Sequence, residues 1–153
     1  MRISRPQMFM DIAHIVAKRS TCFRLNVGAV IVSDRRIVSI GYNGTPPGHA
    51  HCTGNSCPGA QGCSLTTHAE VNALEHLPAG ITEPLDLYVT DSPCIDCTYR
   101  LTKDFRVKRL FFGTPYRIID HLSYDGLPFK VYRITPAGYI IDWQTKDIVD
   151  VVS

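Results

Sequence analysis

Two short motifs in the sequence carry side chains that can hold a metal ion and move a proton. They are His68-Ala69-Glu70 and Pro93-Cys94-Ile95-Asp96-Cys97. One imidazole and two thiolates would give a zinc ion three protein ligands and leave its fourth position open, as in catalytic zinc sites. Zinc lowers the pKa of water from about 16 toward roughly 7, so that water becomes a nucleophile at neutral pH. The motifs therefore indicate metal-assisted hydrolysis, with Glu70 as the proton carrier.

Hydrolytic deamination is the reaction that this combination favours. The attacking water must lose a proton and the departing amine must gain one, and a single carboxylate can serve both steps. Cys94 and Cys97 lie in the expected first turn of a helix, where the helix dipole favours thiolates. His-x-Glu followed by Pro-Cys-x-x-Cys is the signature of zinc-dependent base deaminases.

Each motif has a simpler interpretation when it is taken alone. Thr67 and Glu70 match the capping box Thr-x-x-Glu, so Glu70 could only tie back a helix end, and His68 could be an ordinary polar residue. A lone Cys-x-x-Cys could be a redox pair or half of a structural zinc clip, and Pro93 could be a turn residue. The joint occurrence of both motifs, with a strand between them, favours the catalytic interpretation.

Helices and strands alternate along the chain so that both motifs fall at helix starts. Apolar spacing predicts an opening helix over 6–18, and the runs 27–32 and 36–42 predict a hairpin. The remaining expected elements are a helix over 67–77, a strand over 85–90, a helix beginning beside Cys94, and strands over 107–112, 129–134 and 139–143. This order predicts an α/β fold with a mixed sheet sandwiched between helices.

Length, composition and charge narrow the class of protein. The 153 residues fit a single domain over 1–153, with a Cys- and His-rich loop at about 44–66. The formal net charge of +2 does not favour a nucleic acid partner, and the absence of a long apolar stretch argues against a membrane role. The amino terminus does not resemble a secretory signal, so we expect a cytoplasmic, reducing location.

The cysteines outside the catalytic motif point to a second metal. In a reducing compartment, cysteines serve as metal ligands or catalytic groups more often than as disulfides. Four thiolates suit a closed structural zinc site, which would order a loop with almost no apolar residues to bury. The alternative is four unpaired buried thiols. The candidate ligands are Cys22, Cys52, Cys57 and Cys63, with His49 or His51 as possible substitutes for one of them.

The residues around the motifs resemble deoxycytidylate (dCMP) deaminases, within the zinc-dependent cytidine/deoxycytidylate deaminase superfamily. The resemblance spans about residues 6–116, and its matching segments are 19–22, 26–32, 41–44, 68–74, 88–90 and 93–97. It implies a three-layer α/β/α sandwich with a mixed, roughly five-stranded sheet. It also implies hydrolysis of dCMP to dUMP and ammonia, with dUMP supplied to dTMP synthesis.

The same resemblance implies substrate contacts. Asn43 matches the asparagine that holds the sugar, and the Ala69 backbone matches the group that fixes the carbonyl oxygen of the base. Asn26 and Tyr116 are candidates for phosphate or sugar contacts. Asn43 could instead form an Asn-Gly turn, and Asn26 could only cap a strand. After Tyr116 the sequence departs from the family pattern, and one sequence does not separate plain cytosine from a 5-modified base.

The resemblance further implies assembly and regulation. Family members are commonly hexamers that dCTP activates and dTTP inhibits, so we expect a homo-oligomer with a nucleotide effector, bound together with Mg²⁺. The expected effector site is the loop 43–49, whose glycines would let backbone amides approach a triphosphate.

Three alternative functions stay open. A tRNA adenosine deaminase has the same motifs, but it would be expected to carry a basic face for its RNA. A free cytidine deaminase would not need the 5′-phosphate of its substrate. A zinc-stabilised binding module with an inactive deaminase fold would not need Glu70.

Overall fold

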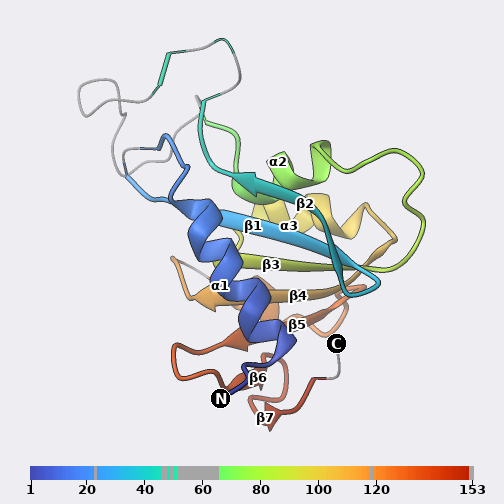
Figure 1. Cartoon of the computed structure of the whole chain (residues 1–153). Coiled ribbons are helices and arrows are strands. Elements are labelled where there is room, and N and C mark those ends of the chain that lie inside the picture. The colour runs from blue at the N-terminus through green and yellow to red at the C-terminus, as the bar shows by residue number, and fades with distance from the viewer. Residues whose placement is uncertain (23, 46–47, 49, 52–65, 118, 152–153) are drawn as a thin grey trace.

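The computed structural model describes residues 1–22, 24–45, 48, 50–51, 66–117 and 119–151 (Figure 1). Within these residues the helices are α1 (Arg5–Ala17), α2 (Ala69–Glu75), α3 (Ile95–Thr102) and the short 3-10 helix η1 (Asp120–Ser123). The strands are β1 (Gly28–Ser33), β2 (Arg36–Tyr42), β3 (Leu85–Asp91), β4 (Val107–Thr114), β5 (Lys130–Ile134), β6 (Ile140–Asp142) and β7 (Ile148–Val149).

All seven strands join in one mixed sheet with the order β2-β1-β3-β4-β5-β6-β7. The central pairs β3–β4 and β4–β5 are parallel, and the other pairs are antiparallel. Parallel neighbours need crossover connections, and α3 supplies the one between β3 and β4. The carboxyl ends of β3 and β4 therefore lie side by side, which is where open α/β sheets bind ligands.

The helices cover both faces of the sheet, as the sequence predicts. On one face α1 packs Phe9 and Met10 onto Tyr88 and Phe111, all of them buried. On the other face α2 and α3 pack onto a second apolar cluster that includes Leu87. Figure 1 shows α1 on one side of the strands and α2 and α3 on the other. The expected three-layer α/β/α architecture is confirmed.

The sheet has more strands than the family resemblance implies. The expectation of roughly five strands is wrong, because β6 and β7 extend the sheet beyond β5. The strand expected over 139–143 is β6, which follows a turn with Gly138 at φ 92°. The two residues of β7 are too few to give a period-two pattern in the sequence.

One glycine sets the height of α2 above the sheet. A Cβ placed on Gly41 of β2 would lie 2.5 Å from both the Ala69 carbonyl oxygen and the Ala73 nitrogen. Because Gly41 has no side chain, the helix backbone rests directly on the strand. Ala69 and Ala73 are themselves 1% and 0% exposed. This close packing fixes the start of α2, which carries the first motif.

No helix among the described residues has the length and apolar character that crossing a bilayer requires.

Candidate active site

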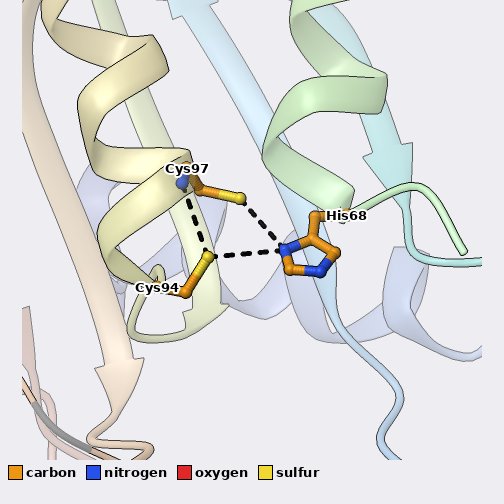
Figure 2. Close-up of side chains that lie close together, drawn as sticks. All are labelled: His68, Cys94 and Cys97. Atoms are coloured by element: carbon orange, nitrogen blue, oxygen red, sulfur yellow. Dashed lines mark hydrogen bonds between the residues drawn. The ribbon is translucent and has the colours of Figure 1, made fainter. Parts of the chain in front are cut away.

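The two motifs meet where α2 and α3 begin. His68 is the N-cap residue of α2, and Cys94 is the N-cap residue of α3. The ligand atoms of His68, Cys94 and Cys97 all lie within 4.8 Å of one another. Figure 2 shows one imidazole nitrogen of His68, from the start of α2, directed at two sulfurs from the start of α3. The fold thus brings the three proposed metal ligands together.

The donor atoms, and one of the two distances between them, suit a tetrahedral zinc ion. Zinc–nitrogen and zinc–sulfur bonds of about 2.1 and 2.3 Å give a nitrogen–sulfur edge of about 3.6 Å in a tetrahedron. The distance from His68 Nδ1 to Cys94 Sγ is 3.6 Å, which equals this edge, whereas that to Cys97 Sγ is 3.0 Å, which is shorter. One nitrogen and two sulfurs are also a donor set that zinc prefers. The residues therefore fit the ion that the sequence predicts.

The local electrostatics prepare Cys94 as a thiolate. Hydrogen bonding from the Cys97 side chain, supported by His68 and by the Cys97 backbone N–H, lowers the pKa of Cys94 to about 3. Hydrogen bonding to Cys94, together with burial, raises the pKa of Cys97. The hydrogen bond to Cys94 likewise raises the pKa of His68. Metal binding consequently requires the release of the proton on Cys97.

Glu70 lies in the first turn of α2 and is only 4% exposed. Burial raises the pKa of its carboxyl group, because a charge is poorly solvated there. A carboxyl group with a raised pKa can both take up and release a proton near neutral pH. Its side chain lines the same cavity as His68 and Cys94.

The capping-box interpretation of Thr67 and Glu70 is wrong. His68, not Thr67, is the N-cap residue, and no side-chain hydrogen bond caps the helix. Thr67 instead pairs with Gly44 in an isolated bridge, with backbone N–O distances of 2.8 and 3.2 Å.

A cavity of about 460 Å³ opens beside these groups. It is large enough for a small-molecule ligand. Three of the four expected substrate-contact residues line it: Asn43, Ala69 and Tyr116. The fourth, Asn26, is exposed and is not part of the lining.

Asn43 is buried and organises one wall of the cavity. Its Oδ1 accepts hydrogen bonds from the Val27 N–H at 2.8 Å and from the Ser20 hydroxyl at 2.5 Å. Its Nδ2 donates to the Leu25 carbonyl at 2.6 Å. The amide group has two N–H donors, and within the described residues only one of them is used, which leaves the other for a ligand.

Several further polar lining residues escaped the sequence analysis, among them Arg24, Ser92, Arg117 and His121. Ser92 directly follows β3, which leads to the cysteine motif, while Arg117 and His121 follow the carboxyl end of β4. Their positions just after the carboxyl ends of expected strands could have marked these residues as candidates for the cavity lining. Arg117 has a φ of 57° and lies with its guanidinium 5.0 Å from the ring centre of Tyr116. Nothing in the sequence around Arg24 marks it as a cavity residue.

The expected second metal site falls largely outside the described residues, where Cys52, Cys57, Cys63 and His49 all lie. Of the candidates in the described part, Cys22 is half-buried and lines the cavity, whereas His51 is exposed.

Comparison with known proteins connects this geometry to a family. The model of the cytidine and deoxycytidylate deaminase zinc-binding region matches residues 3–114. ComE operon protein 2 of Bacillus subtilis is 40% identical over 119 residues, which cover 76% of this chain and 62% of that protein. Deoxycytidylate deaminase of Schizosaccharomyces pombe is 36% identical, and the match covers 80% of this chain and 41% of that protein. Deoxycytidylate deaminase of Mycobacterium phage D29 is 40% identical, and the match covers 63% of this chain and 87% of that protein.

Solved structures give the same result. The dCMP deaminase of cyanophage S-TIM5, in complex with dCMP and dUMP, superposes with a TM-score of 0.75 at 29% identity. The match covers 87% of this chain and 98% of that one. A structure described as a tRNA:A34 deaminase reaches a TM-score of 0.53 at 24% identity, which shows a shared fold alone. In length, this chain spans 62% and 41% of the first two relatives named above.

Proposed function

We propose that this chain, which belongs to the cytidine and deoxycytidylate deaminase family, hydrolyses dCMP to dUMP and ammonia. The observation that carries the proposal is that a buried carboxylate, Glu70, opens onto the same cavity as the zinc ligand group. A cyanophage protein of the same fold has been solved with dCMP and dUMP, which supports this choice of substrate. The product would supply dTMP synthesis.

Each residue has a defined part in the proposed reaction. His68, Cys94 and Cys97 would hold the zinc ion, which would supply the Lewis acidity that lowers the pKa of water toward about 7. Glu70 takes a proton from the attacking water and passes it to the exocyclic nitrogen, so that this nitrogen leaves as ammonia. The Ala69 backbone N–H holds the carbonyl oxygen of the base, and Asn43 holds the sugar through its remaining N–H.

Two arginines favour a nucleotide over a nucleoside. Arg24 and Arg117 both line the cavity, and a guanidinium group is well suited to bind phosphate. Tyr116 lies beneath Arg117 and supports its orientation. We assign the 5′-phosphate to this side of the cavity. Asn26 is not part of the proposed site.

The test is an ultraviolet absorbance assay of the zinc-loaded protein with dCMP, CMP, deoxycytidine, dCTP and tRNA. The proposal expects turnover of dCMP and little of the others. Equal turnover of deoxycytidine would refute the role of the phosphate and favour a nucleoside deaminase. Activity on tRNA alone would identify an RNA-editing enzyme, and binding without turnover would identify an inactive module.

A second, structural zinc is part of the proposal. Cys22, with Cys52, Cys57 and Cys63, or with His49 or His51 in place of one cysteine, would tie the polar loop to the end of α1. The support for this is the loop's composition and the position of Cys22 beside the cavity. Elemental analysis should give two zinc ions per chain, and one in Cys57→Ser. One zinc per chain in the unaltered protein would refute the second site.

The assembly is proposed to be a homohexamer. Three large apolar side chains on or just after α3 are exposed, which suits burial against other copies: Ile95 at 65%, Tyr99 at 62% and Phe105 at 83%. Light scattering after size-exclusion chromatography measures the mass directly. A monomeric mass at micromolar concentration would refute this assignment.

Regulation by nucleotides is a separate proposal. We assign activation by dCTP and inhibition by dTTP, each bound with Mg²⁺, to the loop 43–49, of which 46, 47 and 49 lie outside the described residues. Saturation curves for dCMP that do not change with dCTP or dTTP would refute it. We also propose a cytoplasmic location and a single domain over 1–153, since one sheet takes its strands from residues 28 to 149.

A further inference from the structure

The corner between β3 and α3 determines where one metal ligand points. The chain leaves β3 at Ser92 and Pro93, and Cys94 follows with φ −67° and ψ 169° as the N-cap of α3. The carbonyl of Pro93 and the nitrogen of Cys94 belong to one planar peptide unit. A group that holds the Pro93 oxygen therefore fixes the plane from which the Cys94 side chain projects. Pro93 has no N–H through which the corner could be held instead.

The last residue of β4 and the segment after it hold this corner by three sets of hydrogen bonds. The Ser92 N–H donates to the Thr114 carbonyl at 2.9 Å. The Ser92 hydroxyl accepts from the Tyr116 N–H at 2.7 Å and donates to the Tyr116 carbonyl at 3.2 Å. The third bond joins His121 Nε2 to the Pro93 oxygen at 3.0 Å. Among these contacts, only the one from His121 reaches the peptide that leads to Cys94.

The partner of the His121 ring shows which ring nitrogen donates the hydrogen bond. A carbonyl oxygen can only accept, so Nε2 must carry the proton and donate it. The ring is positioned by η1, where the next residue, Leu122, is 0% exposed in the core. The Leu122 N–H also closes the turn onto the Ile119 carbonyl at 3.0 Å. A buried anchor thus supports a half-buried imidazole that also lines the cavity.

We propose that His121 is a positioning residue, which orients Cys94 for metal binding through the Pro93 carbonyl. The same ring lines the cavity, so one side chain both borders the proposed nucleotide site and supports the metal ligand. Loss of an outer hydrogen bond that orients a metal ligand typically lowers metal affinity about 10- to 100-fold. The inference rests on the proposed zinc site at His68, Cys94 and Cys97.

The experiment compares three substitutions in the full-length protein. His121→Ala removes the ring, His121→Phe keeps its bulk without a donor, and His121→Gln restores an N–H donor at similar reach. His76→Ala is the matched control, because the exposed His76 ring also bonds to a backbone carbonyl, that of Asn72 at 2.8 Å, outside the site. Zinc affinity is measured by competition with a chelator. The absorption of the cobalt-substituted protein reports the geometry of the thiolate ligands.

Zinc affinity should fall about 10- to 100-fold in His121→Ala and His121→Phe, recover in His121→Gln and stay unchanged in His76→Ala. The cobalt bands should shift in the same two variants. If His121→Ala does not fold, the pair of Phe and Gln variants decides the question. Wild-type affinity and spectrum in His121→Phe, or an equal loss in His76→Ala, would overturn the inference. A wild-type protein that binds no zinc at these residues would instead overturn the proposed function.

Discussion

Substitution of Glu70 by glutamine tests the proposed chemistry with little change in packing. Glutamine has the same number of heavy atoms as glutamate, and position 70 is 4% exposed in the first turn of α2. The cavity and the ligand group should therefore stay intact. What is lost is the group that can accept and release a proton.

The expected magnitude follows from the role of the carboxylate. Proton transfer by a positioned side chain contributes about 10²- to 10⁴-fold to a rate, which is about 3 to 5 kcal/mol of transition-state stabilisation. Because Glu70 is proposed to serve both proton transfers, we expect a loss in kcat near the upper end of this range. Thermal stability should not fall, since burial already disfavours the charged carboxylate and the amide carries no charge.

The assay is steady-state turnover of dCMP, with zinc content and melting temperature measured on the same preparation. Glu75→Gln is the matched control, because Glu75 ends the same helix and is exposed. The control should keep wild-type kcat. A Glu70→Gln protein with bound zinc and a kcat within about tenfold of wild type would refute the reasoning. Loss of zinc in this variant would show that Glu70 supports the ligands instead.

Three further outcomes are expected. Cys94→Ala should lose both zinc and turnover, as measured by elemental analysis and the dCMP assay; turnover that survives without zinc would contradict the ligand role. Gly41→Ala should lower the free energy of unfolding in urea by about 1 to 3 kcal/mol, because its Cβ would lie 2.5 Å from α2 backbone atoms; wild-type stability would contradict the close packing. The Arg106 side chain, which donates hydrogen bonds to Asp104, lowers the pKa of that carboxyl group. The ion pair therefore stabilises the folded state above the pKa of about 4 that the carboxyl group has in the unfolded chain. This contribution is lost as the pH falls through the lower pKa of the folded state. Asp104→Asn should therefore cost about 1 kcal/mol at pH 7 and nothing at the acid end, in urea titrations at both pH values; an equal cost at both would contradict the ion-pair explanation.

The parts of the fold that the sequence predicts are those with strong local patterns. The apolar run in β1 is buried along its whole length, and the helix starts at His68 and Cys94 coincide with motif chemistry. The proposed metal ligands are recognisable because the proposed reaction requires these residue types at these spacings. Long-range pairing is less accessible, since β1 lies between β2 and β3 only in the folded sheet.

The missed features depend on tertiary structure. The bond from His121 to Pro93 joins residues with no sequence pattern between them, and η1 is a single short turn. The capping-box pattern was misleading because Thr67 is drawn into a bridge with Gly44, which shifts the N-cap by one residue. Local chemistry favoured one cap, and the tertiary bridge favoured the other.

The hydrogen bonds between the β3–α3 corner and residues 114–121 bear on how this fold can be re-engineered. This stretch contributes Tyr116, Arg117 and His121 to the cavity lining, so exchanging it for the corresponding segment of a relative would change the cavity wall. The exchange would also remove the donor to the Pro93 oxygen, and with it the support that we propose for the Cys94 side chain. A chimera that keeps its metal affinity must therefore supply another hydrogen-bond donor to the Pro93 oxygen, or retain His121 in its original turn.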